Sequence, residues 1–290
     1  MLERDGYLPG VPCWVDTSQP DPEAAVAFYG GLFGWDFEDV MPPGAAGKYL
    51  VAHLHGSDVA AVGSQPDGGP PTAAWNTYVW VESADDAASK VEDAGGRLVM
   101  APFDLMDMAR VAVVTDPEGA AFRVWQAKEH KGARMVNQPG SLTFNGLNSR
   151  AAEAARSFYG SVFGWETLRL EGRAMAWTLA GYGDFVRQRD PELRERMAEA
   201  GVPEGFEDVV AMLMPIEDDQ PEAPAHWSVT FSVEDANATA ERAAELGGRV
   251  VVPPFDAGFV RLTVISDPQG ATFIASEFVP RTGSADGAER

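Results

Sequence analysis

The 290-residue sequence contains few basic residues and a single cysteine. Its 22 Lys and Arg residues are outnumbered by 44 Asp and Glu residues, so the formal net charge at pH 7 is −22. This balance argues against nucleic acid as a partner, because phosphate binding needs surplus Lys and Arg, and also against docking on an anionic membrane. Since Cys13 stands alone, an intramolecular disulfide and a zinc cage of thiolates are both excluded.

Long apolar runs and several catalytic motifs are missing as well. No apolar run reaches the roughly 18–20 residues that a membrane-spanning helix needs, and residues 1–10 are charged rather than basic-then-apolar, as a signal segment would be. The sequence has no nucleophile elbow, phosphate-binding loop or dinucleotide-binding glycine motif. With 45% apolar residues the chain can still bury sizeable cores, and we expect a cytoplasmic globular protein.

The sequence repeats itself. The pattern FYG followed by FGW occupies residues 28–35 and returns at residues 158–165, an offset of 130. A glycine pair and an Asp-Pro-x-Gly-Ala turn recur with offsets of 152 and 151, so the second copy carries about 22 additional residues; these motifs are at 95–96 and 247–248, and at 116–120 and 267–271. We place the insertion near residues 187–208, where RDPELRERMAEAG is typical of a short helix.

Each copy is predicted to contain two βαβββ units. A strand at residues 12–17 precedes a helix with Asp21 as its N-cap and Pro22 at its first position. A strand at residues 75–81 precedes a second helix, which begins at a capping-box pattern, Ser83 with Asp86, and ends at Gly95.

This pattern predicts an α+β fold, a tandem duplication of paired βαβββ units in which each domain is an open, cup-like barrel. The predicted domains are residues 1–132 and 133–290, joined by a polar linker near residues 127–141. The tail that follows Pro280 is predicted to be disordered.

Three motifs carry a resemblance to a known family. DPEAAVAFYGGLFGW, VESADDAASKVEDAGG and TDPEGAAFRVWQ recur in the second copy as AAEAARSFYGSVFGW, VEDANATAERAAELGG and SDPQGATFIASEF. Over roughly residues 10–279 the chain resembles the vicinal-oxygen-chelate superfamily of glyoxalase I, bleomycin-resistance proteins and extradiol dioxygenases, in particular the two-domain glyoxalase-like proteins of actinomycetes. The resemblance implies one cup per domain, but it does not fix an activity, because this fold hosts many chemistries.

The resemblance implies defined positions for a divalent metal. In the family's enzymes, His or Gln in the first strand of a unit and Glu in the last strand bind the metal. Counting from the motifs places aromatic, aliphatic, amide, hydroxyl and cationic side chains at these positions: Trp14, Asn76, Arg123, Phe144, Ser228 and Ile274. Such a set does not suit a divalent metal. We therefore predict no metal and no cofactor.

Strand alternation predicts what lines each cup instead. The first cup is expected to be aromatic, with Asp16 and Arg123 as a possible charged pair among Trp14, Asp16, Asn76, Tyr78, Trp80, Arg123 and Trp125. The second cup is expected to hold Phe144, Gly146, Asn148, Ser228, Thr230, Ile274 and Ser276, with His226 on the same face. The aromatic side chains could equally be core, and the pair could be purely structural.

Two further histidines are candidates for the first cup. In YLVAHLH, Leu50, Ala52 and Leu54 alternate with His53 and His55. The two histidines would then face the cup or a dimer interface, as ligand contacts, as a weak metal pair or as structural residues. Cys13 is expected to be buried and inert.

Three functions remain open. The first is metal-free binding of a small, aromatic or hydrophobic molecule, as in the bleomycin-resistance type. The second is a metal-independent enzyme, such as a hydroxylase or secondary-metabolite tailoring enzyme, that uses Asp16, Arg123 or a histidine for acid–base chemistry. The third is a metal-dependent lyase or dioxygenase. The catalytic residues stay unknown, and the chain is expected to be a monomer or homodimer that binds a small molecule, without nucleic acid or membrane.

Overall fold

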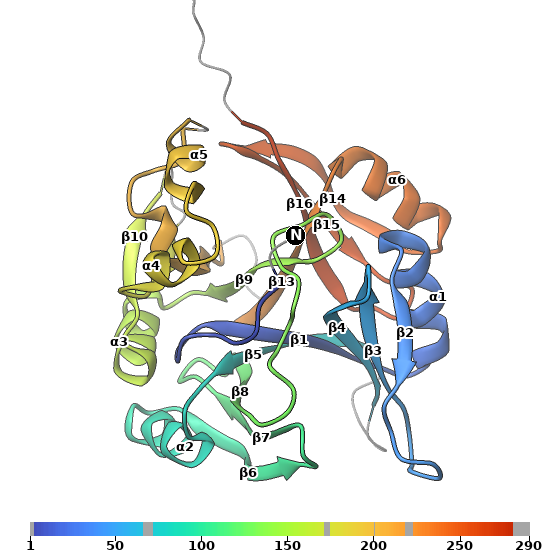
Figure 1. Ribbon diagram of the computed structural model, residues 1–290, viewed down its shortest axis with the longest axis horizontal. Helices are drawn as coiled ribbons and strands as arrows, with labels where there is room; N and C mark the ends of the chain where they lie inside the picture. Colours follow the sequence, from blue (N-terminus) through green and yellow to red (C-terminus); the bar gives the residue numbers. More distant parts are fainter. Residues whose placement is uncertain (1–2, 66–71, 171–174, 200, 218–222, 281–290) are drawn as a thin grey trace, which may run out of the picture.

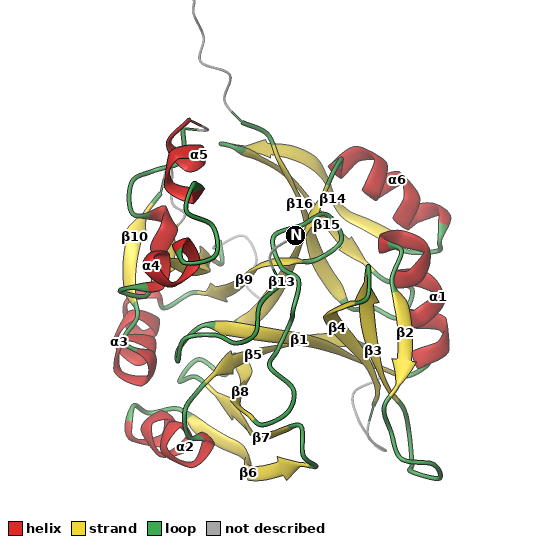
Figure 2. Ribbon diagram, viewed as in Figure 1, coloured by secondary structure: helices red, strands yellow, loops and turns green. Residues whose placement is uncertain are grey.

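The structure, a computed structural model, describes residues 3–65, 72–170, 175–199, 201–217 and 223–280. Its strands form two eight-stranded sheets (Figure 1, Figure 2). The first sheet contains β1 (Pro12–Gln19), β2 (Asp36–Asp39), β3 (Tyr49–Leu54), β4 (Ser57–Ser64), β5 (Ala74–Trp80), β6 (Arg97–Leu105), β7 (Ala109–Thr115) and β8 (Ala121–Ala127). The second contains β9 (Leu142–Ser149), β10 (Glu166–Arg169), β11 (Met175–Thr178), β12 (Val209–Pro215), β13 (His226–Val233), β14 (Arg249–Ala257), β15 (Val260–Ser266) and β16 (Thr272–Phe278).

The two sheets have the same topology. The strand order is β2-β3-β4-β1-β5-β8-β7-β6 in the first and β10-β11-β12-β9-β13-β16-β15-β14 in the second. In each sheet two βαβββ units meet at an antiparallel pair, β1 with β5 and β9 with β13. The predicted α+β duplication of paired units is confirmed, and each sheet is an open cup. The predicted disordered tail lies outside the described residues, and no helix within them is long and apolar enough to cross a membrane.

Six α-helices and a short 3₁₀ helix are found in the described residues: α1 (Pro22–Phe33), α2 (Ala84–Asp93), α3 (Ala152–Phe163), α4 (Tyr182–Arg187), α5 (Leu193–Glu199), η1 (Phe206–Asp208) and α6 (Ala236–Glu245). The starts of α1 and α2 follow the predicted caps. The Asp21 carboxylate accepts hydrogen bonds from two backbone N–H groups of the first turn of α1, and the Ser83 hydroxyl accepts one at the start of α2. Gly34 ends α1 in the left-handed conformation, with φ of 71°.

The repeated motifs join one half of the chain to the other. Helix α1 lies beside α6, and α2 lies beside α3 (Figure 1). The Tyr29 hydroxyl donates to Oδ2 of Asp267 in the other half at 2.9 Å, and the Tyr159 hydroxyl donates to Oδ2 of Asp116 at 3.1 Å. The FYG motif and the Asp-Pro-x-Gly turn therefore make reciprocal hydrogen bonds across the interface between the halves.

The other repeated motifs serve the same interface. The indole N–H of Trp35 donates to the Gly140 carbonyl at 2.7 Å, and that of Trp165 to the Gly10 carbonyl at 2.8 Å. A Cβ on Gly96 would lie 2.9 Å from the ring of Phe158. The Thr115 carbonyl oxygen would lie closer still, at 2.5 Å, so a side chain at Gly96 is excluded both by its own half and by the ring of the other half. At Gly248 the ring of Phe28 is the nearest group, at 2.8 Å.

The two halves differ at one connection. Between β3 and β4 the chain turns through His55 and Gly56, both at positive φ, as a two-residue type I′ hairpin requires. Between β11 and β12 the equivalent connection is the insertion, residues 179–208, which carries α4, α5 and η1. The insertion starts earlier than the predicted residue 187, because Gly181 at φ of 83° begins α4 within a glycine-rich stretch that resembles a turn.

Candidate functional site

Each half of the protein contains a cavity. The first-half cavity has a volume of about 570 Å³ and is lined by strands of the first sheet and by the loops that follow β2 and β6. Its apolar wall is rich in methionine: Val40, Met41, Leu105, Met106, Met108, Trp14 and Trp125. Its polar lining is Asp16, Ser18, Lys48, Tyr49, Ser64, Gln65 and His130. Methionine side chains are flexible and polarisable, so this wall can adapt to ligands of different shape.

Asp16 lies in the centre of a hydrogen-bond network at the base of this cavity. Its carboxylate accepts from the hydroxyls of Tyr78 at 2.6 Å and Tyr49 at 3.1 Å, and from the side-chain amide of Asn76 at 2.7 Å. Burial and the charge of Asp16 raise the pKa of both tyrosines well above the ordinary value, so both remain neutral donors. The network holds a carboxylate in place that is only 6% exposed.

Two of the three predicted tryptophans, Trp14 and Trp125, lie in the cavity wall, but both are buried. Trp14 is 0% exposed and Trp125 is 2% exposed. The Trp14 indole N–H donates to the Tyr49 hydroxyl at 3.1 Å, and its ring lies 4.5 Å from the imidazole of His130. A ligand in the cavity therefore meets Tyr49, His130 and the methionines before it meets the Trp14 ring.

Arg123 occupies a different position from the one considered above. The described residues contain no ion pair between Asp16 and Arg123. The charged pair that the sequence suggested is therefore not formed. The guanidinium of Arg123 instead lies over the ring of Tyr78, 5.3 Å from its centroid, because β8 runs beside β5 and places these two residues opposite each other. Neither Arg123 nor Trp80 lines the first-half cavity, and Trp80 packs against the ring of Tyr7.

The two histidines of the third strand do not share a face. His55 lies in the hairpin turn at φ of 52° and is exposed, which breaks the strand alternation on which the prediction depended. His53 remains in β3, where its Nδ1 lies 3.0 Å from Oδ1 of Asp58. Its partner is therefore a carboxylate of the next strand rather than a ligand in the cavity.

Asp58 also faces His130, a linker residue that the strand pattern did not identify. Nε2 of His130 lies 3.6 Å from Oδ2 of Asp58, and its Nδ1 accepts from the backbone N–H of Gly132 at 3.2 Å. Burial lowers the pKa of His130 below its ordinary value, although Asp58 opposes the shift. The linker and the loop residues Met41, Met106 and Met108 were missed because strand periodicity does not describe loops.

The described residues do not fit the divalent metal that the fold implies. Trp14, Tyr78 and Arg123 lie side by side on three neighbouring strands of the first sheet, and Phe144, Thr230 and Ile274 do so in the second. None of the six positions compared with the family's ligands holds a carboxylate or an imidazole. Within the described parts of the chain, no group of three or more His, Cys, Asp or Glu side chains is arranged to hold a metal ion.

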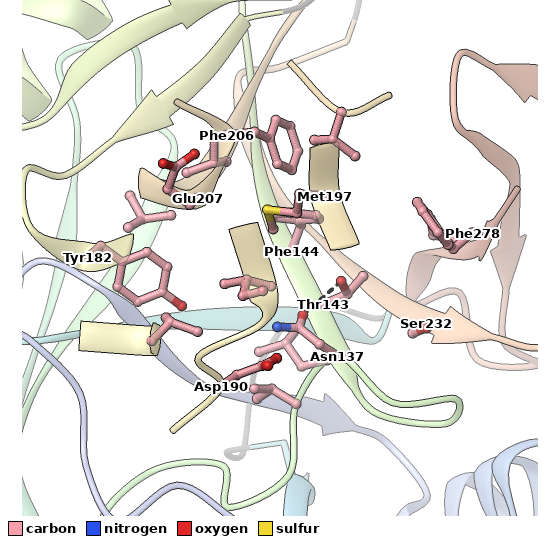
Figure 3. A pocket seen from close by; sticks show the side chains of 18 of the residues that line it. Asn137, Thr143, Phe144, Tyr182, Asp190, Met197, Phe206, Glu207, Ser232 and Phe278 are labelled. Atoms are coloured by element: carbon pink, nitrogen blue, oxygen red, sulfur yellow. Dashed lines mark hydrogen bonds between the residues drawn. The ribbon is translucent and has the colours of Figure 1, made fainter. Parts of the chain in front are cut away.

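The second-half cavity has a volume of about 460 Å³ and lies beneath the insertion. Helices α4 and α5 and η1 lie on one side of it, and β9, β13 and β16 lie on the other (Figure 3). Its apolar side chains include Phe144, Leu193, Met197, Val202, Phe206 and Phe278. Its charged and hydroxyl side chains are Arg4, Tyr7, Thr143, Tyr182, Asp190, Arg196, Glu207, Ser232 and Ser276.

Few of the residues predicted for the second cup line this cavity. Phe144 and Ser276 do so, whereas Gly146, Asn148, Ser228, Thr230 and Ile274 do not. The Ser228 hydroxyl donates to the Gly146 carbonyl at 3.1 Å and accepts from Asn148, so these polar groups satisfy one another on the sheet. His226 is exposed at the start of β13, away from the cavity.

Comparison with known proteins places the chain among related sequences. The Glyoxalase/Bleomycin resistance protein/Dioxygenase superfamily matches residues 14–124 and 141–274. The protein named "Putative glyoxylase CFP32" of Mycobacterium tuberculosis is 38% identical over 284 residues, which cover 97% of this chain and 100% of that protein. Anthracycline biosynthesis protein DnrV of Streptomyces peucetius is 33% identical over 286 residues, which cover 93% and 94%.

A solved structure shows the same fold. The Mn(II)-bound glyoxalase from Novosphingobium aromaticivorans superposes with a TM-score of 0.60, covering 93% of this chain and 83% of that chain. The sequence identity is 15%, so the likeness extends to the architecture and not to the chemistry of the site.

Proposed function

This chain belongs to the glyoxalase/bleomycin-resistance/dioxygenase superfamily, and from that premise we propose that it binds a small, ring-containing apolar molecule in the first-half cavity. The single observation that carries the proposal is a methionine-rich wall around a buried carboxylate, Asp16, in a cavity of about 570 Å³. Concave, mostly apolar sites with a few placed polar groups are typical of small-molecule binding.

The chemistry of Asp16 narrows the ligand class. Three neighbouring side chains donate to this carboxylate, and an ionised carboxylate offers about four acceptor positions. One position remains for a donor on the ligand, such as a phenol or an alcohol. The ligand class is therefore an aromatic molecule with at least one hydroxyl group.

The relatives support an aromatic ligand. DnrV of Streptomyces peucetius and DauV of another Streptomyces strain, which is 33% identical over 298 residues, are both named anthracycline biosynthesis proteins. Anthracyclines are fused-ring aromatic compounds. A methionine-rich wall with an acceptor at its base suits a molecule of that kind.

The test is a calorimetric titration with 2-naphthol and with its methyl ether, which lacks the hydroxyl donor. Met108→Trp should fill the first-half cavity and abolish binding of both probes, whereas Met197→Trp, the matched control in the second-half cavity, should leave it unchanged. Asp16→Asn should weaken 2-naphthol by about 1.5–3 kcal/mol, the range for a hydrogen bond to a charged group, and should leave the ether unaffected. Binding that survives Met108→Trp would contradict the proposal.

A second candidate is acid–base catalysis without a metal, favoured by His130 in the wall of the same cavity. Its Nε2 lies 3.6 Å from Asp58 and has no hydrogen-bond partner among the described residues, so this nitrogen is available for proton transfer. The relative named as a glyoxylase supplies a reaction to try. Isomerisation of the hemithioacetal of methylglyoxal and glutathione, present in the wild type and lost in His130→Gln, would favour this candidate over binding alone.

A further inference from the structure

The second-half cavity contains a buried positive charge without a counter-charge. Arg4 is 9% exposed and lies in the cavity wall, between the ring of Tyr7, at 4.9 Å from the guanidinium carbon, and the ring of Tyr182, at 5.7 Å. No carboxylate of the described residues lies within 4.0 Å of its guanidinium nitrogens, and Nη1 has no hydrogen-bond partner there. A buried cation is costly unless it is paired.

The neighbouring arginines show that acidic partners are within reach of this region. Arg196 pairs with Asp190 and Arg194 with Glu207, both within the insertion, and Arg189 pairs with Asp5 next to Arg4 in the sequence. The chain has twice as many acidic as basic residues, 44 against 22. Acidic groups are therefore plentiful around Arg4, and yet none of the described carboxylates pairs with its guanidinium group.

A second unpaired donor lies beside Arg4. Nη2 of Arg4 donates to the hydroxyl of Tyr182 at 2.9 Å, so that oxygen acts as an acceptor. Within the described chain, the proton of this hydroxyl is not donated to any acceptor. Figure 3 shows Tyr182 with its hydroxyl turned toward the cavity. Two donors, one of them charged, thus stand at the edge of the cavity and lack an acceptor among the described residues. The other charged side chains of the lining, Asp190, Arg196 and Glu207, are all ion-paired.

We propose that the second-half cavity binds an apolar, ring-containing carboxylate, whose anion is held by Arg4 and Tyr182 and whose rings lie against Phe144, Met197 and Phe206. A planar guanidinium matches a planar carboxylate with two hydrogen bonds, which is why arginine recognises this group. The anion would neutralise Arg4 and accept from both unpaired donors. This site is separate from the first-half cavity, which offers a carboxylate rather than a cation.

The position of the donors gives the site a structural consequence. Arg4 comes from the segment that precedes the first sheet, and Tyr182 comes from α4 of the insertion, residues 179–208. A carboxylate bound to both connects these two segments. The insertion would then be a specificity element of the second cup, since the first cup has only the His55–Gly56 turn at the equivalent place.

The experiment compares 2-naphthoate with 2-naphthamide by calorimetry on the full chain. In the wild type the carboxylate should bind about tenfold or more tightly than the neutral amide, as a hydrogen bond to a charged group requires. Arg4→Met should remove this preference and change the affinity for the amide by less than about threefold. Tyr182→Phe keeps the ring and should weaken 2-naphthoate several-fold. Arg156→Met, which removes an exposed arginine of α3, is the matched control and should change nothing.

Cavity-filling variants locate the site. Met197→Trp should abolish binding of 2-naphthoate, and Met108→Trp in the first-half cavity should leave it intact. Equal affinity for the carboxylate and the amide, no binding of 2-naphthoate at millimolar concentration, or a preference that survives Arg4→Met would each overturn the inference. If Arg4→Met fails to fold, Tyr182→Phe and Met197→Trp still decide the outcome. Loss of 2-naphthoate in Met108→Trp alone would place the anion in the other cavity and refute the assignment.

Discussion

Replacing Tyr159 by Phe removes one oxygen atom and breaks two buried hydrogen bonds at the interface between the halves, one to each half. The hydroxyl donates to Oδ2 of Asp116 in the first half and accepts from the indole N–H of Trp227 at 3.0 Å. Tyr159 is 0% exposed, and burial raises the pKa of its hydroxyl well above the ordinary value, so it stays a neutral donor. The two partners left behind are buried, since Asp116 is 2% exposed and Trp227 is 6% exposed.

The expected loss of stability depends on which hydrogen bonds the two partners of the Tyr159 hydroxyl keep after the substitution. Oδ2 of Asp116 has no other donor among the described residues, since the three backbone N–H groups of its turn all bond to Oδ1. A lost hydrogen bond to a charged group costs about 1.5–3 kcal/mol and an orphaned N–H about 1–3 kcal/mol. We expect Tyr159→Phe to lower the free energy of unfolding by about 4 kcal/mol.

The equivalent change in the other half should cost less. Tyr29 donates to Oδ2 of Asp267 and accepts from the indole N–H of Trp75 at 3.1 Å, but the same carboxylate oxygen keeps a bond from the Gln19 amide at 2.7 Å. We expect about 3 kcal/mol for Tyr29→Phe. The difference between the two variants tests the hydrogen-bond reasoning and not merely the importance of the interface.

The assay is urea unfolding followed by tryptophan fluorescence and by far-ultraviolet circular dichroism. Because each tyrosine donates to an aspartate of the other half, both halves should unfold in one transition in the wild type and in the variants. Ser161→Ala, which removes an exposed hydroxyl that donates to the Ser157 carbonyl within α3, is the control and should shift the free energy by no more than about 0.5 kcal/mol. Losses below 1 kcal/mol in both interface variants, or two separate transitions in the wild type, would refute the reasoning.

Two other predictions concern the titration of His130 and the metal content of the protein. Burial lowers the pKa of His130 in the folded state, so the unfolded chain binds more protons than the folded chain below the ordinary value of 6.5. The free energy of unfolding of the wild type should therefore fall as the pH drops below that value. His130→Asn, compared with the wild type by urea unfolding at pH 7.5 and 5.5, should lose this part of the pH dependence. Purified protein should contain no stoichiometric Zn, Ni, Fe or Mn by elemental analysis, because the positions compared with the family's ligands hold Trp14, Asn76, Arg123, Phe144, Ser228 and Ile274; about one tightly bound metal per chain would contradict this.

The fold could be predicted because its signals are local and doubled. Asp21 and Pro22 fix the start of a helix within three residues, and the FYG–FGW pattern occurs twice, so each copy supports the interpretation of the other. The pattern could not reveal that Tyr29 and Tyr159 bond across the halves. Periodicity assigns a side chain to a face but says nothing about which distant element covers that face.

The cavities were predictable only in part, for the same reason. Strand alternation brings Asp16 and Asn76 together correctly, because they lie opposite each other on neighbouring strands. It fails at His55, where the chain has already entered a turn, and it cannot find His130 or Arg4, which reach their cavities from segments outside the strands. Contacts between distant loops depend on the whole fold and leave no periodic trace in the sequence.

The reciprocal bonds between the halves have an evolutionary consequence. Tyr29 reaches Asp267 and Tyr159 reaches Asp116 in the same manner, so a single ancestral half could have made both bonds with a second copy of itself as a homodimer. Once the two copies were fused, each concave face belonged to only one stretch of the gene. A mutation could then change one cup without changing the other. The two halves differ in this way at one connection, which is a two-residue turn in the first half and the insertion in the second.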